Sequence, residues 1–166
     1  MYHEYNKYIL PEHYIEPYGV HGIYHVHRVL YLADKIVEYY NLTESEQEIL
    51  GLACCYHDIG RVHDWEDDSH GRLSCEKIVQ LRLLDEQGLK EIEKELIMKL
   101  ITYHCLADDK FVGSDREMLL FRILKDADGL DRVRIFDLDS AYLRLDISHK
   151  LVKVAWDLFT SSLGKE

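Results

Sequence analysis

The sequence of 166 residues is long enough for a single domain, residues 1–166, with a substantial core, and its 47% of hydrophobic residues excludes a disordered chain. The formal net charge of -11 argues against a surface for nucleic-acid polymers, which needs clustered positive charge, but leaves room for a small anionic substrate held at a metal. No apolar run approaches the roughly 18 residues of a membrane span and the first residues lack a signal peptide's features, so we expect a cytoplasmic protein without membrane contacts.

The expected elements are helices throughout. Only two prolines occur, both near the start, and the alternation of β-branched residues that indicates strands is absent. A short helix and a turn are expected within residues 1–20, and a capping box of Thr43 and Glu46 opens a later helix. The apolar spacing predicts helices over residues 22–40, 44–58, 69–85, 90–105, 115–127 and 148–163, with a less regular stretch over 135–146. The sequence therefore predicts an all-α fold of about six or seven helices.

A His-Asp doublet stands at the end of the helix predicted over residues 44–58. Because residues 49–56 are apolar, His57 and Asp58 are expected to be buried, and a buried carboxylate is usually paired or bound to metal. Imidazole nitrogens and carboxylate oxygens both bind divalent cations. Gly60 is expected to end the helix in a left-handed conformation. The alternative is a plain helix terminus at which Asp58 bonds to the backbone.

Two further residues are candidates to complete a metal site with this doublet. His25 lies on the helix predicted over residues 22–40, and Asp128 lies at the C-terminal end of the helix predicted over residues 115–127. Two imidazoles and two carboxylates from three helices would hold one hard or borderline metal and leave positions open for water. Spacing alone does not establish that the three helices converge.

Two acids close to Asp128 are weighed against it. Asp126 precedes Asp128 by two residues, so a helix would point the two side chains apart. Asp131 is expected to form an ion-pair network with Arg132 and Arg134. Either acid would replace Asp128 if the end of the helix were distorted.

Three short motifs occur in a fixed order along the chain. Residues 24–29, YHVHRV, contain H-x-x-R-V; residues 57–61, HDIGR, are similar to H-D-I-G-K; and residues 124–128, LKDAD, end in an Asp that follows Ala. In this order the motifs resemble those of the HD-domain superfamily of metal-dependent phosphohydrolases, over roughly residues 20–135. Three motifs in order are far more specific than any one of them. The resemblance implies a helical bundle on which the helix over residues 148–163 packs.

The resemblance also implies a function. Members hydrolyse phosphoesters or phosphoanhydrides, often in nucleotides, with a metal-bound water as nucleophile. It implies that Asp58 binds metal and orients the attacking water, and that Arg61 and Arg28 are candidate phosphate clamps, because guanidinium forks match phosphate oxygens. Ion pairs with nearby acids are the alternative for both arginines. His21 precedes His25 by four residues and shares its helical face, so it is expected to contact substrate, whereas His27 should point away.

His70 and His104 raise the question of a second metal. Two-metal subfamilies of the superfamily carry extra histidines after the doublet and at the end of the next helix, where this chain has His70 and His104. Both are therefore expected to bind a second ion or to face the substrate; a solvent-facing helix start and a capped helix end are the alternatives. A metal role for Cys105 is a weaker hypothesis, because the other ligands are oxygen and nitrogen. The ion, one or two per chain, is not distinguished among Mn, Fe, Mg, Zn, Co and Ni.

Several readings stay open at this level. The leading hypothesis is a phosphohydrolase whose partner is a small phosphate or a nucleotide; a di-iron oxygenase and a non-catalytic nucleotide or metal sensor are the alternatives. The sequence does not indicate an oligomeric state. The acidic loop over residues 61–69 is either a solvated turn or a lid. The histidines without a matching context are interpreted as surface residues: His3, His13, His63 and His149.

Overall fold

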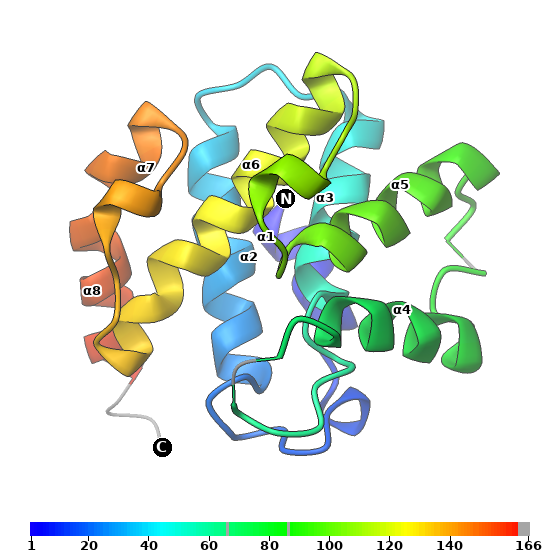
Figure 1. The fold of residues 1–166 in the computed structure, drawn as a ribbon, viewed down its shortest axis with the longest axis horizontal. Coiled ribbons are helices and arrows are strands. Elements are labelled where there is room, and N and C mark those ends of the chain that lie inside the picture. Colours follow the sequence, from blue (N-terminus) through cyan, green and yellow to red (C-terminus); the bar gives the residue numbers. More distant parts are fainter. Residues whose placement is uncertain (66, 86, 163–166) are drawn as a thin grey trace.

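The computed structural model describes residues 1–65, 67–85 and 87–162, and over these ranges the chain is helical and contains no strand (Figure 1). The prediction of an all-α fold is therefore confirmed. The α-helices are α1 (Tyr2–Tyr5), α2 (Ile23–Val37), α3 (Glu44–Tyr56), α4 (His70–Leu81), α5 (Glu91–Tyr103), α6 (Asp115–Leu130), α7 (Asp146–Lys150) and α8 (Val152–Ser162). Short 3-10 turns connect several of them, including η3 (Asp108–Lys110), η4 (Asp131–Ile135) and η5 (Ser140–Tyr142).

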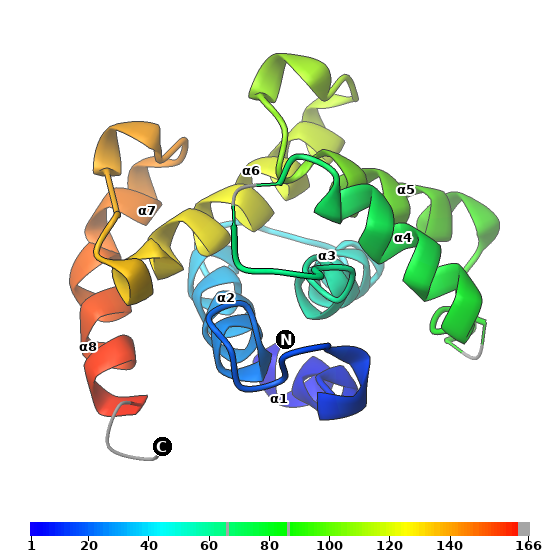
Figure 2. The same ribbon diagram turned by 60° about the horizontal axis from the view of Figure 1, so that its bottom comes forward.

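The centre of the molecule is formed by α2, α3 and α6. Helix α2 packs against α3 and α6, while α4 and α5 pair on one side and α7 and α8 lie on the other (Figures 1 and 2). Their apolar residues form one core in which Leu30, Leu52 and Leu124 are fully buried. Within the described residues, no helix has the length and apolar character needed to cross a membrane.

Several helix ends differ from the predicted ones: α2 ends at Val37 rather than at residue 40, α4 at Leu81 rather than at residue 85, and α6 is longer than predicted. The capping box of Thr43 and Glu46 opens α3 as predicted, but α6 continues past Ala127 to Leu130. The extra turn is stable because Ala127 and Leu130 are fully buried in the core. Asp128 consequently lies inside a helix rather than at its end. The helix predicted over residues 148–163 is interrupted at Leu151 to give α7 and α8, and its last predicted residue is outside the described ranges.

Asp126 anchors the chain that follows α6. Its buried carboxylate accepts hydrogen bonds from the backbone nitrogens of Arg144, at 2.9 and 3.0 Å, and Leu145, at 2.8 Å. The Arg144 guanidinium also reaches Asp108 in η3, with Nε 2.7 Å from Oδ2. As expected, Asp126 points away from Asp128, and its side chain holds the segment between η5 and α7 against α6.

The ion pairs of Asp108 predict a pH-dependent stability. The Arg144 bond, assisted by Lys125, outweighs burial and lowers the pKa of Asp108 to about 2. Since the unfolded carboxyl has a pKa of about 3.9, the ionised form stabilises the fold above that pH, and the contribution is lost as pH falls towards 2. Asp108→Asn should therefore be less stable than wild type at pH 7, and the difference should shrink between about pH 4 and pH 2. Urea unfolding across this range measures it, with the exposed neighbour changed in Asp109→Asn as the control; an unchanging difference would contradict the account.

Gly60 differs from its predicted conformation. Gly88, not Gly60, is the glycine that adopts a positive φ among the described residues, so the predicted left-handed cap is wrong. Gly60 is instead required by close packing: a Cβ there would lie 2.1 Å from Ser74 N and 2.3 Å from the Leu73 carbonyl carbon. The Gly60 amide donates to Ser74 Oγ at 2.9 Å, and the same hydroxyl donates to the His57 carbonyl at 2.6 Å. Helix α4 thereby fixes the turn that carries the His-Asp doublet.

We expect Gly60→Ala to destabilise the protein at or above the upper end of the roughly 1–3 kcal/mol that overpacking costs, because the methyl group meets backbone atoms that cannot rotate away. Gly129→Ala is the matched control. It lies inside α6 and its added Cβ would meet only Leu143 Cδ2, at 3.7 Å, so it should stabilise the fold by about 0.5–1 kcal/mol. Chemical denaturation of both variants measures the difference; equal effects would refute the packing argument.

Candidate metal centre

Four side chains from three helices converge beside the doublet, and we call them the first cluster: His25, His57, Asp58 and Asp128. His25 Nε2 lies 3.2 Å from His57 Nε2, 3.4 Å from Asp58 Oδ2 and 3.4 Å from Asp128 Oδ1. His57 Nε2 is 3.7 Å from Asp58 Oδ2. These separations are those of atoms that share one cation at bond lengths of about 2.0–2.2 Å. The three predicted helices do converge.

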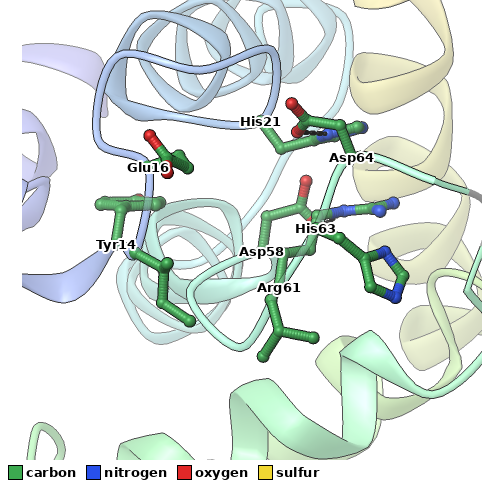
Figure 3. A pocket seen from close by; sticks show the side chains of 9 residues that line it. Tyr14, Glu16, His21, Asp58, Arg61, His63 and Asp64 are labelled. Carbon is green, nitrogen blue, oxygen red and sulfur yellow. Dashed lines mark hydrogen bonds and ion pairs between the residues drawn. The ribbon is translucent and has the colours of Figure 1, made fainter.

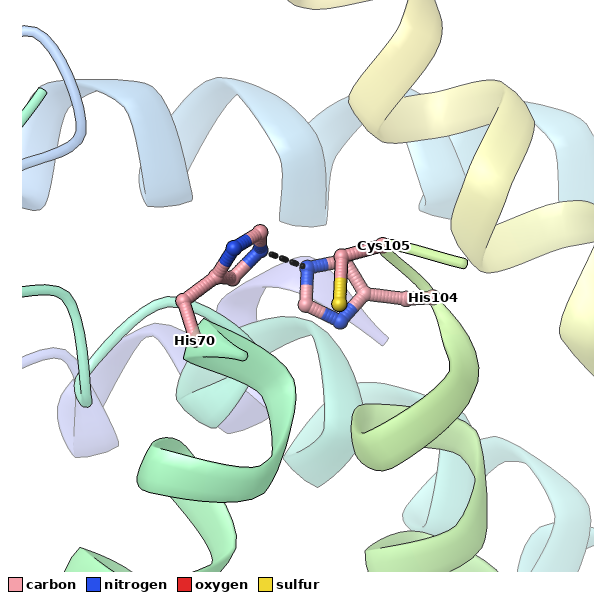
Figure 4. A group of neighbouring side chains, drawn as sticks. All are labelled: His70, His104 and Cys105. Atoms are coloured by element: carbon pink, nitrogen blue, oxygen red, sulfur yellow. Dashed lines mark hydrogen bonds between the residues drawn. The ribbon is translucent and has the colours of Figure 1, made fainter. Parts of the chain in front are cut away.

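A second cluster adjoins the first, formed by His70 at the start of α4, His104 just after α5 and the other oxygen of Asp58. His70 Nε2 and His104 Nε2 are 2.9 Å apart, and they lie 3.3 and 3.6 Å from Asp58 Oδ1 (Figure 4). The two carboxylate oxygens of Asp58 thus face different histidine pairs. His70, His104 and Asp58 Oδ1 are thus a second set of donors that would hold a cation beside the first cluster.

Each of the four imidazoles is oriented by a bond to its other nitrogen. His25 Nδ1 donates to Asp131 Oδ2 at 2.7 Å, His57 Nδ1 to the Cys54 carbonyl at 2.8 Å and His104 Nδ1 to the Ile101 carbonyl at 2.6 Å. His70 Nδ1 donates to the Asp67 carbonyl. A proton on Nδ1 leaves the Nε2 lone pair free, so all four rings present a donor atom towards the clusters.

The protonation states suit cation binding. Burial lowers the pKa of His57 to about 3 and that of His70 to about 4, so both are neutral near pH 7. Burial lowers the pKa of His25, but its bonds to Asp131 and Asp58 raise it above the ordinary value. Burial would raise the pKa of Asp58, yet the surrounding imidazoles and Arg61 hold it well below its usual range. A buried carboxylate kept ionised beside the neutral imidazoles of His57 and His70 is a donor set that a divalent ion complements.

Asp58 also supplies a direct test of fit. The residue is 2% exposed, and its Oδ1 makes no hydrogen bond although it is buried and faces His70 and His104. Arg61 Nε lies 3.1 Å away as an ion pair, but leaving a buried oxygen without a hydrogen bond costs free energy, which a cation between the three side chains would recover. The residues present therefore fit a divalent metal in both clusters.

The clusters open onto a cleft of about 730 Å³. Its lining includes His70, His104 and Asp128 of the clusters and the cations Lys125, Arg132 and Arg144. The volume lies within the roughly 300–1,000 Å³ of small-molecule sites. Trp65, which is 79% exposed, lies at the cleft on the loop after Arg61. A molecule of nucleotide size fits in this space.

Comparison with known proteins supports the same assignment. A family model described as "HD domain" matches residues 22–133, more than half of the chain. The chain belongs to the HD domain family. Searches among curated proteins and among solved structures gave no significant match. HD domains bind divalent metals, so the family and the clusters together indicate metal-dependent hydrolase-type chemistry.

Within the HD domain, Arg61, His21 and Asp58 line one small pocket, with Asp64 beside His21 (Figure 3). Arg61 Nε is 3.1 Å from Asp58 Oδ1, and its guanidinium donates to the Trp65 carbonyl at 3.2 Å. His21 Nδ1 is 2.8 Å from Asp64 Oδ1. Both residues line the large cleft as well as this small pocket, whose volume of about 40 Å³ has room for about one or two waters. Arg61 and His21 thus border both the large cleft and the pocket that Asp58 lines.

Arg28 lies elsewhere. Its side chain is buried and points at Asp131, with Nε 2.6 Å from Oδ1 and Nη2 3.2 Å from Oδ2. Arg28 therefore fits the alternative of an ion pair and does not fit the role of a phosphate clamp. Asp131 does form an ion-pair network, but its arginines are Arg28 and Arg134, while Arg132 pairs with Asp137. Neither Asp126 nor Asp131 takes the place of Asp128.

His27 and His13 belong to neither cluster. His27 points away from the cluster as expected and lies 3.4 Å from the Tyr2 hydroxyl. His13 is 7% exposed and packs edge-on against Tyr56, so its interpretation as a surface residue is wrong. The other three of that group are exposed: His3, His63 and His149. The sequence missed that Asp131 orients His25; its position three residues after Asp128 was the available signal.

Proposed function

We propose that this HD domain hydrolyses a phosphoester or phosphoanhydride bond of a small molecule, in the size range of a nucleotide, with two divalent ions. The observation that carries the proposal is Asp58, whose Oδ2 faces His25 and His57 while Oδ1 faces His70 and His104. His25, His57, Asp58 and Asp128 would hold the first ion, and His70, His104 and Asp58 the second. Bound there, the ions would supply an activated water and polarise the phosphoryl oxygens.

The chain's own residues have defined tasks in this reaction. Asp58 orients the water, because its carboxylate lies between the two clusters and stays ionised. Arg61 binds a phosphoryl oxygen from the loop side, and its bond to the Trp65 carbonyl holds the guanidinium in position. His21, held by Asp64, contacts the substrate beside it. Because His25, His57 and Asp58 are buried, little bulk water surrounds the reacting atoms.

The test is phosphate release by protein loaded with Mn²⁺, Co²⁺ or Ni²⁺, over a panel of nucleotides and phosphomonoesters. We expect turnover that a chelator abolishes and added metal restores. Iron-dependent O₂ uptake without phosphate release would instead establish the oxygenase alternative. Ligand-induced thermal stabilisation without turnover on any phosphate would establish a sensor. The native ion, one of Mn, Fe, Mg, Zn, Co or Ni, follows from elemental analysis of protein purified without added metal.

Arg61→Lys separates the role of the guanidinium fork from that of charge. Lysine keeps the positive charge but binds as a point charge, so we expect KM for the phosphate substrate to rise roughly tenfold, the loss of one charge-assisted bond. Steady-state kinetics on the best substrate of the panel measures it. Arg72→Lys is the control, because Arg72 is exposed on α4 and pairs with Glu76. An unchanged KM would assign Arg61 to the ion pair with Asp58 alone.

A further inference from the structure

Cys105 stands beside the second cluster. One nitrogen each of His70 and His104 and the Cys105 sulfur lie within 4.8 Å of one another (Figure 4). The thiol is half-buried, lines the cleft and donates to the Asp68 carbonyl at 3.3 Å. Space for it is kept by Gly71, where a Cβ would lie 3.2 Å from Cys105 Sγ. The sulfur is therefore close to the histidines on a wall that is open to solutes.

A second observation points to a cation here: a buried carboxylate oxygen makes no hydrogen bond in this group, and Arg61 Nε, 3.1 Å from it, is its charged neighbour. Asp58 Oδ1 is buried, makes no hydrogen bond and is aimed at His70 Nε2 and His104 Nε2, 3.3 and 3.6 Å away. Two nitrogens and one oxygen thus converge on one point, with sulfur as a fourth donor next to them. In a tetrahedral zinc site, bond lengths of about 2.0 Å to nitrogen and 2.3 Å to sulfur place these donors about 3.5 Å apart. The sulfur lies within 4.8 Å of a nitrogen of each histidine, so the thiol must come closer to reach that geometry.

We propose that Cys105 binds the second ion as a thiolate, completing a ligand set of two nitrogens, one oxygen and one sulfur. The inference rests on the proposed function, whose second ion it completes. Binding forms a metal–sulfur bond and breaks the S–H bond, and the proton leaves to solvent. The Asp68 carbonyl then loses the thiol as its hydrogen-bond donor and accepts a hydrogen bond from water in the cleft instead.

The two positions are then chemically unequal. The first cluster offers nitrogen and oxygen only, which suits Mn²⁺ or Fe²⁺, whereas sulfur favours a thiophilic ion such as Zn²⁺ or Co²⁺. The second position should reject Mg²⁺, which prefers oxygen ligands. A chain loaded with a mixture of ions should therefore carry different metals in its two clusters.

Titration of the full-length chain with Co²⁺ tests the proposal without using activity. We expect two ions per chain and an intense thiolate-to-cobalt charge-transfer band in the near ultraviolet, which belongs to the second ion. Cys105→Ser should lose the band, and Cys75→Ser should keep it, since Cys75 is buried and bonds to Met98 and Thr102. Two bound ions without the band would overturn the role of Cys105 and leave the proposed function standing; no bound ion would overturn both.

Alkylation gives a second measurement that does not depend on a variant folding. Cys54, Cys55 and Cys75 are buried, so Cys105 should react first with iodoacetamide in metal-free protein. We expect Zn²⁺ to slow modification of Cys105 at least tenfold, read by mass spectrometry of the peptides. An equal rate with and without Zn²⁺ would overturn the proposal.

Discussion

Replacing Asp58 with Asn is expected to remove both ions and abolish turnover. Asp58 is the residue that both clusters share, and an amide presents one neutral oxygen where a carboxylate presents two charged ones. Loss of an outer partner of a metal ligand already costs roughly 10–100-fold in affinity or activity, so loss of the bridging ligand should cost more than 100-fold. Equilibrium dialysis against Co²⁺ and phosphate-release assays measure the two effects.

Asp128→Asn is the matched comparison for Asp58→Asn. Asp128 faces His25 in the first cluster, 3.4 Å from its Nε2, and also lies within 4.8 Å of a nitrogen of His104, although His70, His104 and Asp58 Oδ1 supply three donors to the second position without it. Its variant should retain the second ion, whereas Asp58→Asn should retain neither. If Asp58→Asn still bound two ions, Asp58 would not be a bridge, and the assignment of two adjoining ion positions would fail. Circular dichroism shows whether each variant is folded before its ions are counted.

The second large effect is expected at Asp131, which bonds to His25 Nδ1 and not to the Nε2 that faces the first cluster. Its fully buried carboxylate accepts from His25 Nδ1 at 2.7 Å and from Arg28 Nε at 2.6 Å, and Arg134 lies 3.7 Å away. Removing one partner of a buried ion pair costs about 3–5 kcal/mol, so Asp131→Ala should unfold at much lower urea concentration. Asp137→Asn, at an exposed acid that pairs with Arg132, should change stability by no more than about 0.5 kcal/mol.

Asp131→Asn separates orientation from folding. The amide keeps the shape of the carboxylate but weakens the bond that fixes the proton on His25 Nδ1. We therefore expect roughly 10–100-fold weaker binding of the first ion, with the second ion little affected. Calorimetric titration of each ion measures it. Unchanged affinity for both ions in a folded Asp131→Asn protein would assign Asp131 a purely structural role.

The helices were predictable because their signals are local. Apolar spacing and the capping box of Thr43 and Glu46 act within a few residues, and α3 begins at its predicted residue, Glu44. Helix ends were less predictable where tertiary packing decides them. The extra turn of α6 depends on the burial of Leu130, and the role of Gly60 depends on Ser74 from another helix. Neither contact has a signature in the neighbouring sequence.

The site, like the helices, was predictable only in part. His25, the doublet and Asp128 carry motifs, and the structure brings these four together from three helices. His70 and His104 were candidates because of their place after the doublet. Both Arg28 and Arg61 lie in motifs, and the sequence does not show which of their side chains reaches a cleft. Only the fold places Arg28 on Asp131 and Arg61 at the cleft.

The donor atoms come from residues 25 to 128, so the chain must close almost completely before all of them meet. A nascent chain on the ribosome holds no complete coordination sphere until α6 has emerged. Ions that bind only the closed chain stabilise it by mass action. If the site forms only after the folding transition state, bound cations slow unfolding and leave the folding rate unchanged.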